Sequence, residues 1–113
     1  MVLDAGIKLG KEVFRPCLEE MDKNPPEFVG GKVRVHPSVL KIMKACGEGG
    51  WIATSAHYEL GGQQLPLMVS GACRYILAAA NFPASAFPFL TSAGIHLLER
   101  FGSKEIIELT FLN

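Results

Sequence analysis

The chain has 113 residues, enough for one domain with its own core and too few for two. Its 11 basic and 11 acidic residues cancel, so no net charge attracts nucleic acid or anionic lipid. Charged residues make up 19% of the chain and hydrophobic residues 49%, so we expect part of the apolar surface to face a neighbour.

The three cysteines, Cys17, Cys46 and Cys73, are odd in number and far apart. They lack the close pairs that are typical of zinc sites and disulfide scaffolds, and His36 and His57 have no metal-ligand spacing either. We therefore expect no metal site and a reducing, cytoplasmic setting. The N-terminal residues also lack the uninterrupted apolar core of a signal peptide.

A first amphipathic helix is predicted over residues 3–21. Apolar residues recur there at three- and four-residue steps, at Leu3, Ile7, Phe14, Leu18 and Met21. Pro16 lies inside this pattern and is expected to kink the helix or divide it in two. The Asn-Pro-Pro sequence at 24–26 ends the pattern and Gly-Gly at 30–31 indicates a turn, so we expect a linker loop here.

Two further helices are predicted in the middle of the chain, on either side of a loop. Pro37 and Ser38 suit a helix entrance, and an apolar face follows before Gly47, which is expected to end the helix. Residues 47–66 contain five glycines around the apolar anchor Trp51, and we expect an ordered loop. A third helix begins after Pro66, with apolar residues on one face from position 67 to position 79. It is expected to be largely buried.

The last two predicted helices complete the fold class. Pro88 suits the first turn of a fourth helix that runs to Phe101, with Gly102 as its stop. Ser103 is expected to cap a fifth helix that has Glu105 in its first turn. Sequential helices with short loops predict an all-α fold, a helical bundle of about five helices, in a single domain over residues 1–113.

Residues 75–98 contain no Asp, Glu, Lys or Arg and are long enough to span a bilayer. Polar residues and two prolines, Pro83 and Pro88, interrupt this stretch. Lipid cannot satisfy the carbonyl groups that prolines leave unbonded. We therefore expect buried helices and no membrane span.

Ser92, His96 and Glu99 are four and three residues apart, so on a helix they share a face and could be a hydrolase triad. However, a nucleophile needs an exposed turn and an oxyanion hole, and a serine within a helix usually bonds to its own backbone. The favoured interpretation is structural. The glycine clusters at 47–50 and 61–62 are likewise expected to form turns, because neither has the strand-before-helix setting of a phosphate-binding loop.

One motif series is more specific. Gly50-Trp51 is followed, after a gap, by Glu-Leu-Gly-Gly-Gln-Gln-Leu-Pro at residues 59–66. Acyl-CoA dehydrogenases carry Gly-Trp, Pro-Glu-Glu-Tyr-Gly-Gly and Gly-Leu-Pro at this spacing, and the chain resembles their N-terminal helical domain. His57-Tyr58 stands where the family has Pro-Glu. Further segments similar to the family lie at residues 12–16, 79–81, 87–91 and 102–105. Residues 30–33, which precede Pro37, are similar to the bacterial methylmercaptopropionyl-CoA dehydrogenase-like branch.

The resemblance implies a flavoprotein that oxidises an acyl-CoA thioester to the 2,3-enoyl-CoA. In this family a glutamate of the C-terminal domain removes the α-proton while FAD accepts a hydride from the β-carbon. The resemblance places the middle β domain, the C-terminal helical domain and most FAD contacts beyond Asn113. We therefore assign no catalytic or FAD-binding residue here and expect this chain alone to be inactive. The implied partners are acyl-CoA, further copies of the protein and electron-transfer flavoprotein.

The same resemblance implies that this domain supplies one wall of the acyl pocket. Carried over by position, the wall residues are Ser85, Ala86, Phe89, Leu90 and Ala93. The last four follow three- and four-residue steps, so they can present one apolar face. The alternative for each residue is that it simply packs the bundle. The alternative for the whole chain is a non-catalytic helical module whose apolar surface binds a partner protein; a bare surface of this kind also favours a homo-oligomer.

Overall fold

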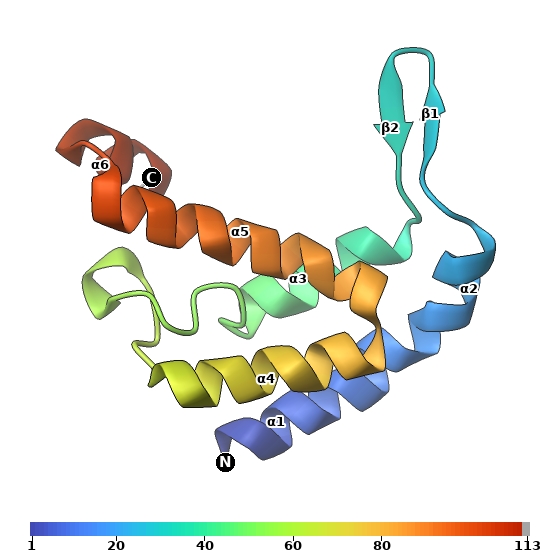
Figure 1. The fold of residues 1–113 in the computed structure, drawn as a ribbon, viewed down its shortest axis with the longest axis horizontal. Helices are drawn as coiled ribbons and strands as arrows, with labels where there is room; N and C mark the ends of the chain where they lie inside the picture. Colours follow the sequence, from blue (N-terminus) through green and yellow to red (C-terminus); the bar gives the residue numbers. More distant parts are fainter. Residues whose placement is uncertain (112–113) are drawn as a thin grey trace.

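The computed structural model describes residues 1–111 and is predominantly helical (Figure 1). Leu112 and Asn113, the end of the predicted domain, lie outside the described residues. The expectation of a helical domain is confirmed, but a small two-stranded sheet interrupts the all-α pattern. The elements are α1 (Val2–Leu9), α2 (Leu18–Lys23), β1 (Glu27–Val29), β2 (Lys32–Arg34), α3 (Ser38–Glu48), α4 (Leu67–Ala80), α5 (Phe82–Phe101) and α6 (Lys104–Phe111).

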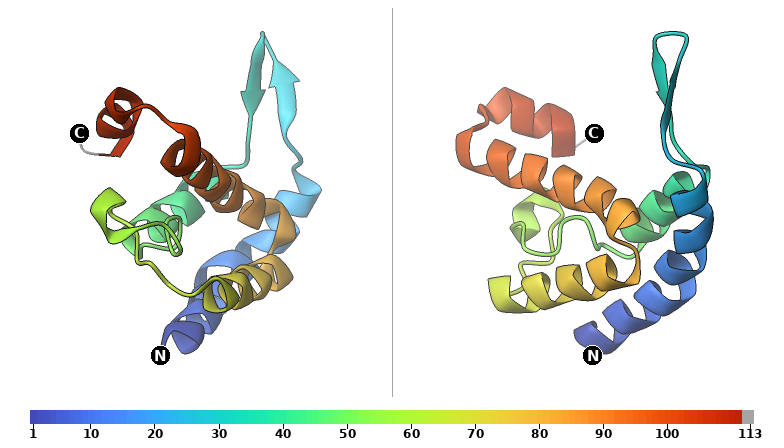
Figure 2. Two further views of the ribbon diagram at one scale, coloured as in Figure 1. Left: turned by 60° about the vertical axis from the view of Figure 1, so that its left-hand side comes forward. Right: turned by 45° about the vertical axis from the view of Figure 1, so that its right-hand side comes forward.

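The molecule, including its projecting β1–β2 hairpin, is flat, with extents of 42 × 41 × 19 Å. Helix α4 packs against α1 on one side and against α5 on the other (Figures 1 and 2). Helix α3 also packs against α5, and α6 folds back from the end of α5. The glycine-containing loop between α3 and α4 lies beside α5, so this loop and α5 form one continuous surface.

The first helical segment changes its geometry around Pro16. Helix α1 passes into a π-helical turn at Gly10–Phe14, then into a 3₁₀ turn at Arg15–Cys17, and then into α2. Pro16 has no N–H to donate to the carbonyl of the preceding turn, so a regular α-helix cannot continue through it. The prediction that Pro16 divides the first helix is therefore confirmed.

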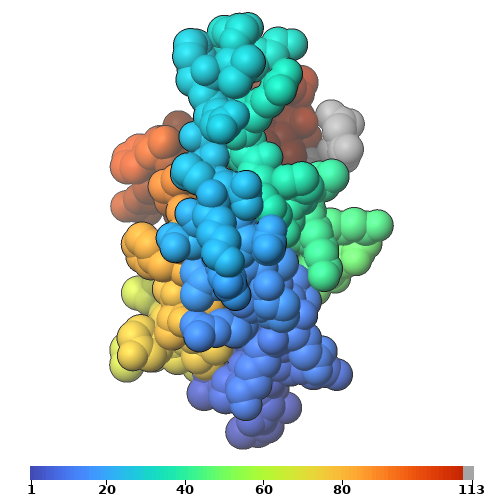
Figure 3. Space-filling view, turned by 90° about the vertical axis from the view of Figure 1, so that its right-hand side faces the viewer, coloured from blue at the N-terminus to red at the C-terminus, as the bar shows by residue number. Residues whose placement is uncertain are grey.

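Residues 27–34 form a hairpin that projects from the body of the molecule (Figure 3). The antiparallel register pairs Phe28 with Val33. Gly30 and Gly31 form the turn with φ of +59° and +78°, which two-residue hairpin loops require and which glycine adopts without strain. The predicted turn is confirmed, but the predicted linker loop is wrong, because the residues that flank the turn pair as strands.

Helix α3 extends past Gly47, so the prediction that this glycine ends the helix is wrong. The helix runs to Glu48 and ends in a Schellman motif. Trp51 N–H donates to the Cys46 carbonyl (2.8 Å) and Gly50 N–H donates to the Gly47 carbonyl (3.1 Å). Gly50 has the φ of +71° that this motif needs. The end of α3 thus fixes the start of the loop that follows.

Helix α4 is less buried than predicted. Leu67, Met68 and Tyr75, from the face expected to be buried, are exposed. The buried side chains of α4 are instead those of Ser70, Cys73 and Leu77. The helix is apolar around most of its circumference, so periodicity alone could not identify the buried side.

Helix α5 begins at Phe82, earlier than predicted, and Pro88 lies inside it and not in its first turn. The Asn81 side chain explains the start, because its Oδ1 accepts the backbone N–H of Ala84 (3.1 Å) as an N-cap. Pro83 lies in the first turn, where a missing N–H leaves no intrahelical bond unmade.

The predicted end of α5 and start of α6 are confirmed. Gly102 follows α5 with an extended backbone. Ser103 Oγ accepts the backbone N–H of Ile106 (3.3 Å), and Glu105 lies in the first turn of α6.

The uncharged stretch at residues 75–98 is shared between α4 and α5, which meet at Asn81. Over residues 1–111, no helix has both the length and the apolar composition needed to cross a bilayer.

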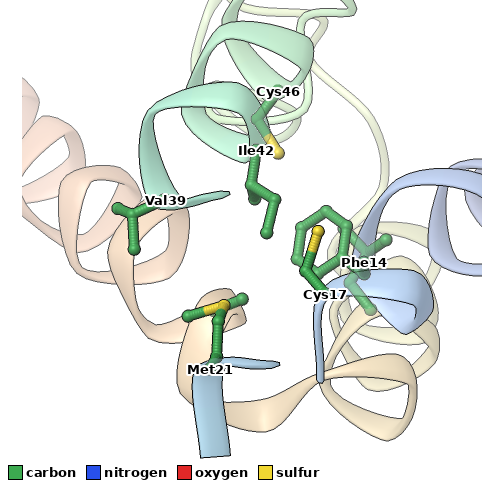
Figure 4. Packing of buried hydrophobic residues seen from close by; sticks show 8 residues of the cluster. Phe14, Cys17, Met21, Val39, Ile42 and Cys46 are labelled. Atoms are coloured by element: carbon green, nitrogen blue, oxygen red, sulfur yellow. The ribbon is translucent and has the colours of Figure 1, made fainter. Parts of the chain in front are cut away.

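The core lies where the first helical segment, α3, α4 and α5 meet (Figure 4). Phe14 is at its centre and is 0% exposed. The buried members of the cluster are Phe14, Cys17, Met21, Val39, Ile42, Cys46, Leu77 and Ala84.

All three cysteines are free and buried. Burial raises the pKa of Cys46 to about 11 and also raises the pKa of Cys73. These two thiols therefore stay protonated at neutral pH and contribute as small apolar groups.

Candidate functional site

The five predicted wall residues all lie on α5, but they differ in their surroundings. Ser85 is buried, and its Oγ donates to the Phe82 carbonyl (2.7 Å). Phe89 is half-buried and packs against the core cluster. Leu90 is 72% exposed and Ala93 is also exposed. The set therefore includes inward-facing residues and solvent-facing residues.

The solvent-facing members belong to a longer apolar row along α5. We call this row the α5 stripe, and its members are Phe82, Ala86, Leu90, Ala93, Leu97 and Phe101. Its residues follow each other at three- or four-residue steps, so they lie on one side of the helix. Its four largest side chains are exposed. Continuous exposed apolar surfaces of this kind commonly mark a contact with a ligand or another protein.

Phe89 and Ser92 are both held by Arg74 of α4. The Arg74 guanidinium lies 5.6 Å from the centre of the Phe89 ring, within cation–π range. Arg74 also donates a hydrogen bond to Ser92 Oγ. This contact connects α4 to α5 and gives the buried Ser92 hydroxyl a partner.

The helical triad Ser92, His96 and Glu99 is only partly assembled. His96 Nδ1 lies 3.2 Å from Glu99 Oε2, as the three-residue spacing allows. His96 Nε2, however, lies 2.9 Å from the hydroxyl of Ser55, which comes from the loop before α4. The structural interpretation of Ser92 agrees with its bond to Arg74. Sequence reasoning missed Ser55, because no local pattern connects this loop residue to α5.

Glu99 also binds the loop through His57. The backbone N–H of His57 donates to Glu99 Oε1 (3.0 Å), and His57 Nδ1 lies 2.9 Å from the same oxygen. The pKa of Glu99 is lowered from its ordinary value of 4.5, mainly because the His57 N–H stabilises the carboxylate and also because His96 does so. Glu99 is therefore ionised at neutral pH and holds two histidines together.

The loop that carries Ser55 and His57 is ordered, as predicted. Thr54 Oγ1 and Ser70 Oγ share a buried hydrogen bond of 2.7 Å, and Leu65 N–H donates to the Thr54 carbonyl (2.8 Å). Gly62 lies so close to the Ala56 carbonyl that a Cβ atom would overlap it. The predicted role in turns is confirmed for Gly61 and Gly62 by this close packing and by the left-handed backbone of Gly61, whereas Gly47 of the other cluster lies inside α3.

Two of the surface hollows within residues 1–111 have a mainly apolar lining. One, of about 320 Å³, lies between the first helical segment and α4 and is lined by Ile7, Gly10, Lys11, Arg15, Tyr75, Ile76, Ala79 and Ala80. The other, of about 260 Å³, includes Ala86, Phe87 and Val39 in its lining. Of the predicted wall residues, only Ala86 lines either hollow. Within residues 1–111, no group of three or more His, Cys, Asp or Glu side chains is placed to hold a metal ion.

The Glu99→Gln substitution is expected to lower the free energy of unfolding at neutral pH by about 0.5–1.5 kcal/mol, the net contribution of one hydrogen bond, because a neutral amide is a weaker acceptor for the N–H groups of His57 and His96 than a carboxylate. Because the folded-state pKa of Glu99 is depressed, this contribution is present above the ordinary pKa of 4.5. It is lost as the pH falls through the folded-state pKa. Urea denaturation at neutral pH and at about pH 3 should therefore show that the difference between wild type and variant shrinks in acid.

Glu59→Gln is the matched control, because Glu59 is exposed and belongs to the same loop. It should leave the free energy of unfolding unchanged within about 0.5 kcal/mol at both pH values. A Glu99→Gln difference that stays constant into acid would contradict the role of the ionised carboxylate.

No protein-family model matches the chain, and no curated protein matches it. A function for the chain is therefore inferred from its motifs and from the geometry described above.

Proposed function

We propose that the chain is the N-terminal helical domain of a flavin-dependent acyl-CoA dehydrogenase and forms one wall of its acyl pocket. The complete enzyme oxidises an acyl-CoA thioester to the 2,3-enoyl-CoA. The motif series from Gly50-Trp51 to Pro66 motivates this assignment. We also propose that the chain has the fold of the dehydrogenase N-terminal domain. The observed series of helices is compatible with that fold.

The α5 stripe is the observation that supports this proposal best. Ala86, Leu90 and Ala93, three of the five positions carried over from the family, belong to it. The stripe contains no charged side chain, which suits an alkyl or aryl chain, because each buried methylene contributes about 0.8 kcal/mol. Among the five carried-over positions, Leu90 has the only large apolar side chain that is exposed, at 72%.

The chemistry of these residues suits binding of the acyl chain and not binding of FAD. When bound, FAD supplies the hydride acceptor, and we propose that its phosphates and ring are held outside this chain. The α5 stripe does not suit the phosphates, since it offers no cation to them. Its proposed contribution is to bind the acyl chain, to fix its position and to exclude water.

The test is a spectrum of the purified product of the gene that encodes this chain. We expect flavin absorbance, and we expect anaerobic bleaching by at least one acyl-CoA thioester but not by the corresponding free acid. A colourless protein that cannot be reconstituted with FAD would contradict the proposal.

A Leu90→Trp substitution in the same gene product tests whether the α5 stripe forms a wall of the acyl pocket. Because Leu90 faces solvent in this domain, the larger ring should not disturb its folding. It should raise KM by roughly 10-fold for the longest accepted acyl chain and leave KM for the shortest unchanged. Met68→Trp is the matched control, since Met68 is similarly exposed but lies on α4. Equal effects of both variants would count against the wall.

The second candidate function is a non-catalytic helical module that binds a partner protein. The α5 stripe also favours it, because exposed apolar helix faces are common docking surfaces. In the dehydrogenase, the proposed partners are further copies of the protein and electron-transfer flavoprotein. Absence of flavin together with stable capture of a protein through the stripe would favour the module.

A further inference from the structure

Ser55, His96 and Glu99 are connected in the order hydroxyl, imidazole and carboxylate. An ionised carboxylate only accepts hydrogen bonds, so the His96 nitrogen that faces Glu99, Nδ1, carries the proton. In the neutral imidazole, Nε2 is then the unprotonated nitrogen, and it accepts a hydrogen bond from the Ser55 hydroxyl, with 2.9 Å between Nε2 and Oγ. This is the tautomer and the direction of hydrogen bonding that activate a serine nucleophile.

The carboxylate is itself held in place. Glu99 Oε1 accepts the backbone N–H of His57 (3.0 Å), while Oε2 faces His96. Both oxygens are therefore engaged, and rotation of the carboxylate would break a bond to the loop. A group that orients a catalytic base needs this kind of support from its surroundings.

The cluster is both rigid and accessible. Thr54, the neighbour of Ser55, is fixed by its buried 2.7 Å hydrogen bond to Ser70. The His96 side chain is 38% exposed and that of Glu99 is 16% exposed. Ser55 is partly exposed as well. A small substrate can therefore approach the hydroxyl and the imidazole while the carboxylate stays mostly covered.

We propose that Ser55 is a nucleophile towards activated carboxylic esters, such as aryl esters and thioesters, with His96 as general base and Glu99 as positioning residue. Ser55 Oγ attacks the carbonyl carbon, and its proton passes to His96 Nε2. The bond to the leaving group then breaks, and the alcohol or thiol departs with that proton. Water next attacks the acyl-serine and gives a proton to His96, which returns it to Ser55 Oγ as the carboxylic acid leaves.

The expected substrates have good leaving groups. General base catalysis by a positioned histidine contributes about 10²–10⁴-fold. The cluster supplies the base but no oxyanion-hole donor, so only esters and thioesters with good leaving groups are expected substrates, and amides are not. No oxidation or reduction occurs, so this activity is independent of flavin and of the dehydrogenase proposal.

The experiment treats the 113-residue chain with a fluorophosphonate probe and maps the adduct by mass spectrometry, then measures hydrolysis of p-nitrophenyl acetate. The adduct is expected on Ser55, and hydrolysis should be lost in Ser55→Ala. His96→Gln should slow both reactions by about 100-fold or more. Glu99→Gln should lower the rate and change its pH profile, because the imidazole tautomer is no longer fixed. Circular dichroism checks that each variant remains helical.

Ser38→Ala is the matched control. Ser38 is also partly exposed and lies near a histidine, but its backbone N–H, and not its hydroxyl, contacts His36 (3.2 Å). The Ser38→Ala variant should hydrolyse p-nitrophenyl acetate at the same rate as the wild type. The proposal would be overturned if Ser55 of the wild type stays unlabelled, or if labelling is equally fast in His96→Gln. The adduct map of the wild type tests the proposal even if a variant fails to fold.

Discussion

Replacing Phe14 with alanine is expected to lower the free energy of unfolding by about 3–5 kcal/mol, the range for large-to-small substitutions of buried aromatic residues. Phe14 is 0% exposed and lies at the centre of the core, among side chains from three other helices. Two contributions to stability are lost: the hydrophobic free energy of burying the ring, and the van der Waals contacts of the neighbours that would line the remaining cavity. Since single domains are stable by about 5–15 kcal/mol, the variant should be close to unfolding.

Chemical denaturation followed by circular dichroism measures this change. Phe28→Ala is the matched control, because the Phe28 ring is 75% exposed on the hairpin. It should alter the free energy of unfolding by no more than about 0.5 kcal/mol. A loss below about 1 kcal/mol for Phe14→Ala would show that Phe14 is not at the centre of the core.

Asn81→Ala is expected to cost about 2–4 kcal/mol, because one side chain performs two roles. Its Oδ1 caps α5 at the Ala84 N–H, and loss of an N-cap costs about 1 kcal/mol. Its Nδ2 donates to the Phe14 carbonyl (3.1 Å), and an unpaired buried carbonyl costs about 1–3 kcal/mol more. Asn81 is 0% exposed, so water cannot replace either bond.

Two further variants separate these contributions. Asn81→Ser keeps an N-cap oxygen but cannot reach the Phe14 carbonyl in the same way, so it should recover only about 1 kcal/mol. Asn24→Ala removes an exposed amide that bonds the Glu20 carbonyl, and it should cost no more than about 0.5 kcal/mol. Equal stability of Asn81→Ala and the wild type in urea denaturation would contradict both roles.

The sequence predicted the helices best where one residue ends or begins them for a local reason. Ser103 caps α6 and Gly102 follows α5, because their effects depend only on neighbouring backbone groups. The start of α5 was missed because Asn81 is an N-cap without a run of polar residues around it. The hairpin was missed because both faces of its strands are exposed, so no alternation of polar and apolar residues marks it.

The candidate site residues also divide into those whose contacts follow from local sequence spacing and those whose contacts depend on the tertiary fold. His96 and Glu99 are one helical turn apart, so their contact follows from sequence spacing. Ser55 joins them across 41 positions, and its place depends on how the loop closes onto α5. The burial of Ser85 beside the exposed Leu90 depends on the packing of α5 against α4 and α3, which periodicity does not specify.

The thinness of the molecule has a consequence for the whole surface. A body 19 Å thick has room for only about two layers of helices, since a helix with its side chains is about 10–12 Å across. Every helix therefore has a side in contact with solvent, whatever its composition. A chain that is 49% hydrophobic cannot place all of its apolar side chains between two such layers. The remaining apolar side chains must therefore lie on solvent-exposed surfaces. Any molecule that binds the folded chain on these surfaces adds its binding free energy to the stability of the fold.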